Sequence, residues 1–251
     1  MADTVTWINF LTTRAGQTVS AWERAVFARL NRSVQGLRAV QIGAAAIDAF
    51  EQSSISHRIL IEDKALRLEE NDLRHLVLAS PHALPIESES IDYVVLPHAL
   101  DKNNTDTKAL LDEVMRILAP NGIVATTFFN ANGSWCWLEK FFLSTPLPSD
   151  ARAISVASAR TDLSLAGFSI EGGHFGVYGV GRQTSVPHAL LPTWMDKAGD
   201  RWWPTMGNVA FLYARKRVNG MTLVGKSAFR KVRLPMGSSV LAHKQAEADQ
   251  S

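Results

Sequence analysis

Short apolar runs recur through the middle of the chain at the length of buried strands, and glycine, proline or acidic residues close most of them. The runs that predict strands are 37–42, 58–61, 75–78, 91–96, 123–129 and 209–214. A looser stretch with several glycines, 168–178, predicts a bent or bulged strand. The pattern therefore indicates a sheet built from strands that are spread over most of the chain.

Apolar side chains at three- and four-residue spacing predict two amphipathic helices, one over residues 19–30 and one over 107–118. The candidate N-caps are Thr18 or Ser20 for the first helix and Thr105 or Asp106 for the second. A shorter helix is predicted over 44–50. Strands that alternate with helices favour an α/β fold, in which helices cover both faces of a mainly parallel sheet.

The composition is that of an ordinary globular protein, with 46% hydrophobic and 20% charged residues among 251. No apolar run reaches the length of about 18 residues that a membrane-spanning helix needs. The first residues lack the pattern of a signal peptide. Cys136 is the single cysteine, which excludes an internal disulfide and a cysteine-based zinc site, and no metal site is expected. We therefore expect a cytoplasmic protein.

Charge is distributed unevenly along the chain. Residues 201–246 contain nine Lys or Arg and no Asp or Glu, although the whole chain carries a net charge of only +2. This basic end predicts contact with nucleic acid, anionic lipid or another acidic partner, or else a solvated tail that serves solubility. The pattern divides the chain into an N-terminal helical lead-in over 1–36, a main domain over 37–217 and a basic, disordered tail over 218–251.

Residues 83–129 carry the most informative motif. It combines a Leu-Pro pair before a strand, an acidic residue inside that strand, and an Arg-x-Leu-x-Pro-x-Gly run after a helix. The residues that carry it are Leu84, Pro85, Ile86, Ser90, Asp92, Val94, Arg116, Leu118, Pro120 and Gly122. In this block the chain resembles the class I S-adenosylmethionine (SAM)-dependent methyltransferases of the small-molecule type, and the resemblance extends over 37–217.

Three further motifs resemble a group of bacterial methyltransferases with a degenerate glycine loop. They are Leu-Pro-His-x-Leu at 96–100, Phe-Asn at 129–130, and Trp-Trp-Pro at 202–204 followed by Ala-Arg-Lys-Arg at 214–217. The resemblance implies a Rossmann-like sheet of seven strands whose last strand is antiparallel. It also implies that SAM lies across the carboxyl ends of the first strands.

The resemblance implies cofactor contacts at the ends of four strands. The implied residues are Gly43, Ala44, Glu62, Asp63, Ala79, Ser80, Leu96 and Pro97. Gly43 stands where the family has a glycine-rich loop, but alanines follow it, so a positive φ at 45 or 47 would be costly. Glu62 would accept hydrogen bonds from the ribose hydroxyls, whereas Ser80 replaces the family's acidic residue near the adenine.

His98 is the residue predicted to act in catalysis, because it follows the fourth strand at a position that opens beside the reactive methyl group in this family. A histidine that titrates near neutral pH can remove a proton from an oxygen or nitrogen acceptor. The alternative is a histidine that is hydrogen-bonded for structure alone. Five tryptophans after the fifth strand, Trp135, Trp137, Trp194, Trp202 and Trp203, suit a ligand pocket or an ordinary core equally well.

The resulting hypothesis is a SAM-dependent methyltransferase that acts on an unidentified small-molecule or lipid-like acceptor. The alternative is a catalytically inactive methyltransferase-like protein that binds or scaffolds, with its basic end on nucleic acid or another acidic partner. A nicotinamide-dependent dehydrogenase is less well supported, since the sequence lacks Gly-x-Gly-x-x-Gly.

Overall fold

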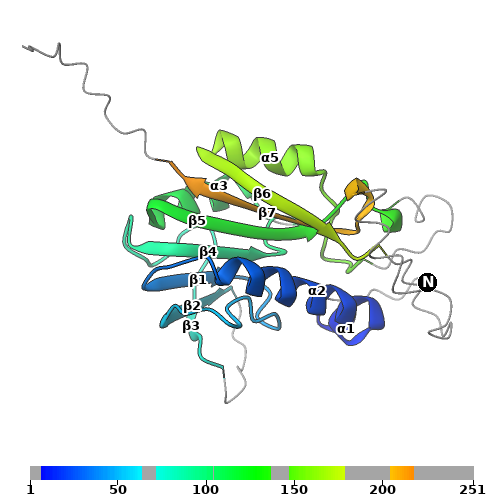
Figure 1. Ribbon diagram of the computed structural model, residues 1–251, viewed down its shortest axis with the longest axis horizontal. Coiled ribbons are helices and arrows are strands. Elements are labelled where there is room, and N and C mark those ends of the chain that lie inside the picture. Colours follow the sequence, from blue (N-terminus) through cyan, green and yellow to red (C-terminus); the bar gives the residue numbers. More distant parts are fainter. Residues whose placement is uncertain (1–6, 64–71, 104, 137–146, 179–203, 218–251) are drawn as a thin grey trace, which may run out of the picture. The chain divides into compact units, whose positions relative to one another are not determined.

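The computed structural model describes residues 7–63, 72–103, 105–136, 147–178 and 204–217 (Figure 1). All of them belong to one compact unit, residues 1–218. The proposed division into 1–36, 37–217 and 218–251 stays a prediction, and the expected tail lies outside the described residues.

The described residues form one seven-stranded sheet in the order β3-β2-β1-β4-β5-β7-β6. The strands are β1 Arg38–Ile42, β2 His57–Glu62, β3 His75–Leu78, β4 Ile91–Pro97, β5 Leu118–Phe129, β6 Phe168–Gly176 and β7 Val209–Lys216. Strands β1 to β5 pair in parallel, and β7 runs antiparallel to both β5 and β6. The prediction of a Rossmann-like, mainly parallel sheet with an antiparallel last strand is confirmed. The predicted bulge is also confirmed, since the β6–β7 register shifts between Ile170 and Gly172.

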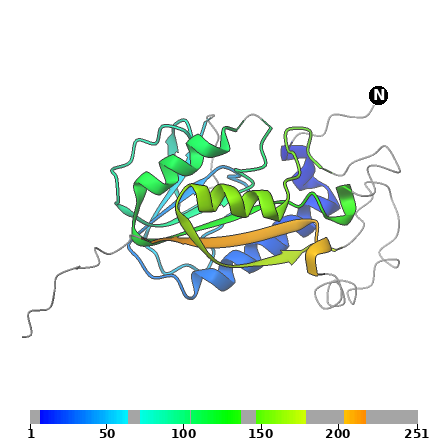
Figure 2. The same ribbon diagram turned by 90° about the horizontal axis from the view of Figure 1, so that it is seen from above.

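Helices cover both faces of the sheet, as the sequence predicted (Figures 1 and 2). Helix α2, Arg14–Asn31, packs Val26 and Phe27 against the apolar side chains on one face of β1, β4, β5 and β7. Helices α3, Thr107–Ile117, and α5, Val156–Leu165, lie side by side over the other face. No helix in the described ranges is long and apolar enough to cross a membrane.

Helix α2 begins earlier than predicted, and a short helix, α1 Trp7–Thr12, precedes it. The N-cap of α2 is Thr13, whose hydroxyl oxygen accepts a hydrogen bond from Gly16 N at 3.1 Å. The prediction of Thr18 or Ser20 as the cap is therefore wrong, because both residues lie inside the helix. The prediction of Asp106 as the cap of α3 is confirmed by its hydrogen bond with Ala109 N.

The predicted helix over 44–50 is wrong, because this segment consists of turns. An α-helix needs its carbonyl groups for its own backbone bonds. Here the carbonyls of Ala44, Ala45 and Ile47 accept hydrogen bonds from the side chains of Gln41 or Arg74. The chain therefore crosses this end of the sheet as an ordered loop.

The motif in residues 83–129 holds the middle of the sheet together. Arg116 donates to the carbonyls of Leu84 and Ile86, at 3.0 and 2.8 Å, and pairs with Glu113. Through Oδ2, Asp92 accepts from the backbone N–H groups of residues 37 and 38, at 2.7 and 3.0 Å, where β1 begins. The motif residues Arg116 and Asp92 therefore stabilise the fold itself, whether or not a ligand is bound.

Candidate functional site

The carboxyl ends of four parallel strands bring the predicted cofactor residues to one edge of the sheet. Gly43 N donates to the carbonyl of Ile61 at 3.0 Å, and Ala79 N donates to the carbonyl of Glu62 at 3.0 Å. A Cβ on Gly43 would lie 3.9 Å from the carbonyl oxygen of Pro97. The ends of β1, β2, β3 and β4 are therefore neighbours, as a shared ligand would require.

The loop after β1 begins with two residues in the left-handed region of the backbone map. Gly43 has φ +80°, which glycine adopts without strain, and Ala44 has φ +47°. A left-handed alanine costs roughly 1–2 kcal/mol. The sequence predicted backbone strain at positions 45 or 47, but neither residue has a positive φ. The strained residue is Ala44 instead.

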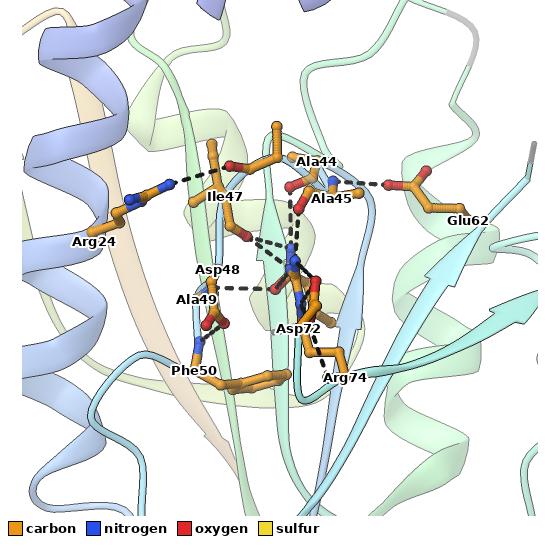
Figure 3. Close-up of polar contacts among 12 residues, drawn as sticks. Arg24, Ala44, Ala45, Ile47, Asp48, Ala49, Phe50, Glu62, Asp72 and Arg74 are labelled. Atoms are coloured by element: carbon orange, nitrogen blue, oxygen red, sulfur yellow. Dashed lines mark hydrogen bonds and ion pairs between the residues drawn. The ribbon is translucent and has the colours of Figure 1, made fainter. Parts of the chain in front are cut away.

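Two buried polar side chains, Gln41 and Arg74, form hydrogen bonds with this loop, and Figure 3 shows Arg74 beside it. The amide of Gln41 donates to the carbonyls of residues 43, 44 and 47, at 3.1, 3.2 and 2.8 Å. Arg74 donates to Gln41 Oε1 and to the carbonyls of residues 45 and 47, and it pairs with Asp72 at 2.6 Å. These bonds replace the backbone bonds that a helix would supply after the first strand. No local pattern in the sequence predicts this contact, because Arg74 lies 33 residues after Gln41.

Glu62 lies at the end of β2 and faces the loop. Its Oε1 accepts a hydrogen bond from Ala45 N at 2.9 Å (Figure 3). Burial raises the pKa of Glu62, and the positive charge of Lys102 opposes that rise. Asp63 follows and is exposed. The predicted ribose-binding residue is therefore at the edge of the sheet, next to the predicted glycine loop.

The remaining predicted cofactor residues differ in what they can offer. Ala79 is partly buried against the core, while Ser80 is exposed and its hydroxyl oxygen accepts from His82 N at 3.3 Å. Pro97 ends β4 and presents its carbonyl near Gly43. Leu96 is fully buried in the core, so its side chain does not reach the edge.

His98 is buried between two carboxylates and two aromatic rings. Its Nδ1 lies 2.7 Å from Asp101 Oδ2. Its Nε2 lies 2.9 Å from Glu23 Oε1, at ion-pair distance. The rings of Trp7 and Phe129 lie 4.6 and 4.3 Å from the imidazole, centre to centre. The two carboxylates and the two aromatic rings surround the imidazole, and His98 is buried.

The charges around His98 determine its protonation. Burial alone would lower the pKa of His98, but Asp101 and Glu23 outweigh burial and raise the pKa to about 10. At neutral pH the ring is therefore a cation, with each nitrogen facing a carboxylate. In this arrangement His98 has no free lone pair with which to accept a proton, and its predicted role as a general base stays a prediction.

Several buried polar atoms near His98 have no hydrogen-bond partner among the residues that the structure describes. They are both carboxylate oxygens of Glu23, Asp101 Oδ1, Trp7 Nε1 and Thr127 Oγ1. Most buried polar groups in proteins are paired, so a group of unpaired ones calls for an explanation, such as a catalytic role or a bound ligand. The sequence did carry a sign of Glu23, since this charged residue lies on the same helix face as Val19, Val26 and Phe27.

The segment after β5 is fixed to the segment before β7 by two asparagines. Asn130 donates to the carbonyls of Thr205 and Gly207, at 2.9 and 2.8 Å, and Asn208 accepts from Trp135 N at 2.8 Å. Thr205 belongs to the 3-10 helix η2, Pro204–Met206. The Phe-Asn motif thus contacts the segment that follows the Trp-Trp pair.

Aromatic side chains gather at this end of the sheet. Phe10, Phe129 and Trp135 are buried together, and the partly buried Trp7 packs on them. Of the five tryptophans considered in the sequence, Trp135 belongs to this core. The other four, Trp137, Trp194, Trp202 and Trp203, lie outside the described residues.

Comparison with known proteins supports the fold and the motif. Residues 40–126 match the methyltransferase domain family. A chain in the Haloferax volcanii complex of the Trm112 methyltransferase activator with a methyltransferase is similar in structure, with a TM-score of 0.57 and 17% identity over 82% of this chain and 93% of that one. A SAM-dependent methyltransferase from Thermotoga maritima gives a TM-score of 0.53 and 15% identity, over 79% of this chain and 91% of its own. A Methanosarcina mazei SAM-dependent methyltransferase gives a TM-score of 0.51 and 13% identity, over 75% of this chain and 97% of its own. No curated protein matches the chain.

Proposed function

We propose that this chain, whose residues 40–126 match the methyltransferase domain family, uses SAM to methylate a small-molecule or lipid-like acceptor. The observation that carries the proposal is the position of Glu62, half-buried at the end of β2 with its carboxylate against the loop after β1. A catalytically inactive binding protein is the alternative, and cofactor binding and turnover separate the two.

The residues at the edge of the sheet suit each part of the cofactor. Glu62 would accept from the ribose hydroxyls, and the backbone of Gly43 and Ala44 would contact the methionine part. Ala79 and Ser80 would lie beside the adenine, where the hydroxyl of Ser80 replaces a carboxylate. Asp63 and the backbone of Pro97 complete the proposed contacts, and Leu96 supports them from the core.

The group around His98 suits a positively charged ligand. Two carboxylates and one imidazolium leave one net negative charge in a buried position. Glu23 Oε2 and Asp101 Oδ1 form neither a hydrogen bond nor an ion pair with any described residue. SAM supplies a methyl group on a positively charged sulfur, and an uncompensated buried negative charge would stabilise that sulfur.

His98 is proposed to act as a positioning residue. Asp101 Oδ2 accepts from both His98 Nδ1 and Phe129 N, at 2.7 and 2.8 Å, and so joins the ends of β4 and β5. Methyl transfer depends on alignment of the reacting groups, and a rigid end of the sheet provides that alignment. The acceptor would then need to be nucleophilic without giving its proton to His98.

The aromatic group beside His98 supports an apolar acceptor. Trp7, Phe10 and Phe129 pack at this end of the sheet, and the buried Trp7 Nε1 has no hydrogen-bond partner among the described residues. Aromatic side chains with a few polar atoms are typical of pockets for small organic ligands. This combination favours a small-molecule or lipid-like acceptor over a macromolecule.

Calorimetry with SAM and S-adenosylhomocysteine tests the cofactor site. The full-length chain is expected to bind both, and Glu62→Ala is expected to weaken binding about ten- to a hundredfold, through the loss of hydrogen bonds to a charged group. Glu51→Ala is the matched control, because Glu51 is exposed in the loop before β2. Absence of binding at millimolar cofactor would contradict the proposal.

Transfer of a labelled methyl group tests the acceptor class. The chain is incubated with methyl-labelled SAM and a cell extract divided into small-molecule, lipid, protein and nucleic-acid fractions. Label is expected in the small-molecule or lipid fraction and in none of the others. Label in protein or nucleic acid would show that the acceptor class is wrong while the methyltransferase activity is right.

A further inference from the structure

Lys102 places its ammonium group directly beside the loop after β1. A Cβ on Gly43 would lie 3.3 Å from Lys102 Nζ and 3.7 Å from its Cε. The lysine belongs to the turn after β4 and is partly buried. The absence of a side chain at position 43 therefore leaves room for this ammonium next to the backbone of the loop.

The backbone around Lys102 is fixed, so the position of its side chain is a property of the fold. Lys102 forms an isolated antiparallel bridge with Ala151. On either side, Arg152 N donates to the carbonyl of Asp101 at 2.7 Å, and Asn103 N donates to the carbonyl of Asp150 at 3.0 Å. Substitution of the side chain would leave these backbone contacts in place.

The Lys102 ammonium has electrostatic influence but no close partner. Its charge is the largest effect opposing the rise in the pKa of Glu62. Across the described ranges, no hydrogen bond or ion pair engages its Nζ. A partly buried lysine that lies beside the loop backbone and lacks a direct counter-charge is suited to binding an anionic group.

We propose that Lys102 binds the carboxylate of the methionine part of SAM, an inference that rests on the proposed function. SAM has one carboxylate, while its sulfur and amino group are positive, so a lysine at this place attracts the carboxylate and repels the rest. Two backbone donors of the loop are already used, since Gly43 N is bonded to the carbonyl of Ile61 and Ala45 N to Glu62. The ammonium of Lys102 supplies the positive charge that glycine-rich loops supply through their N–H groups.

The test compares SAM with decarboxylated SAM, which lacks only the carboxylate. Calorimetry on the full-length chain is expected to give about ten- to a hundredfold tighter binding of SAM. Lys102→Met is expected to lose this preference by weakening SAM alone, and Lys102→Arg is expected to retain part of it. Lys108→Met is the matched control, since Lys108 is exposed on α3 and pairs only with Asp112 among the described side chains.

Three results would overturn the role of Lys102. If Lys102→Met binds both compounds as the unmodified chain does, the lysine makes no contact with the cofactor. If it binds both more tightly, the lysine obstructs the site. If it weakens both equally while circular dichroism shows a normal fold, the effect is not on the carboxylate. Lys102→Gln serves as a second neutral variant should Lys102→Met misfold. Failure of the unmodified chain to bind either compound would instead overturn the proposed function.

Discussion

At the scale of single residues, the buried group of Glu23, His98 and Asp101 is stabilised by its ion pairs and destabilised by burial of charge and by backbone strain at His98. The imidazolium offsets two buried carboxylates, and the aromatic rings of Trp7 and Phe129 exclude water from it. His98 also has φ +48°, an uncommon backbone conformation for a residue with a side chain. Strained and incompletely paired residues of this kind persist where the surrounding structure forces them, often at functional sites.

The raised pKa of His98 predicts how its ring behaves in solution. The ring is expected to stay protonated between pH 6 and 8.5, while histidines exposed to solvent titrate near 6.5. NMR titration of the carbon-bound ring protons of His98 measures this. A midpoint near 6.5 for His98 would contradict the ion-pair arrangement and restore the general base.

The same shift predicts a pH-dependent stability. The folded pKa of about 10 exceeds the unfolded value of 6.5, so the contribution of His98 is complete below pH 6.5 and is lost as pH rises towards 10. His98→Gln leaves both carboxylates without a cation, and the expected cost is about 3–5 kcal/mol near pH 6.5. Urea unfolding should show that this difference becomes smaller as pH approaches 10. A difference that does not change with pH would contradict the linkage.

Some of these residues could be identified from sequence and others could not. His98 and Glu62 follow recognisable strands, so their place at the carboxyl edge follows from the strand order alone. Asp101 lies three residues after His98 and could have been noticed. The charge state of His98 could not be predicted, because it depends on Glu23, which is 75 positions away and is brought near only by the packing of α2 on the sheet.

At the scale of elements, the loop over 43–50 takes the place of the helix that the alternating pattern predicted. Most strands were predictable because they are short apolar runs, several of which end at a glycine, proline or acidic residue. Helix α5 was missed because only Ala159 and Leu163 are buried along it, which is too weak a period. The loop was misread because its stability comes from Gln41 and Arg74, and side-chain bonds over such distances leave no periodic signal.

Arg74→Met tests whether Arg74 holds this loop in place. The substitution removes the donors for Gln41 Oε1 and two loop carbonyls and leaves Asp72 without its partner, so unfolding should require about 3 kcal/mol less. SAM binding should weaken as well, because the loop beside Gly43 loses its support. Urea denaturation and calorimetry measure the two effects. Arg29→Met, an exposed change on α2, is the control and should stay within about 0.5 kcal/mol.

At the scale of the whole molecule, part of the basic end is already used within the fold. Arg215 pairs with Glu171, and Lys216 is buried, where it donates to Glu89 and to the carbonyls of Met115 and Leu118. Residues 218–251 contain five Lys or Arg and two acidic residues, a net of +3, and the whole chain carries +2. Residues 1–217 therefore carry −1, so any attraction of a polyanion by net charge must come from the last 34 residues.

Removal of residues 218–251 tests the predicted acidic partner. The shortened chain should keep the unfolding temperature and SAM affinity of the full chain, because residues 1–218 form one compact unit and contain all the proposed site residues.

The full chain should bind a DNA duplex, which serves as a model polyanion. The logarithm of its binding constant should fall with the logarithm of the salt concentration, with a slope no steeper than about −4.5, because five cations can each displace about 0.9 counterions. The shortened chain should lose this binding in fluorescence anisotropy. Equal binding by both chains would assign the contact to residues 1–217, and a tail that only serves solubility would give no salt-dependent binding in either chain.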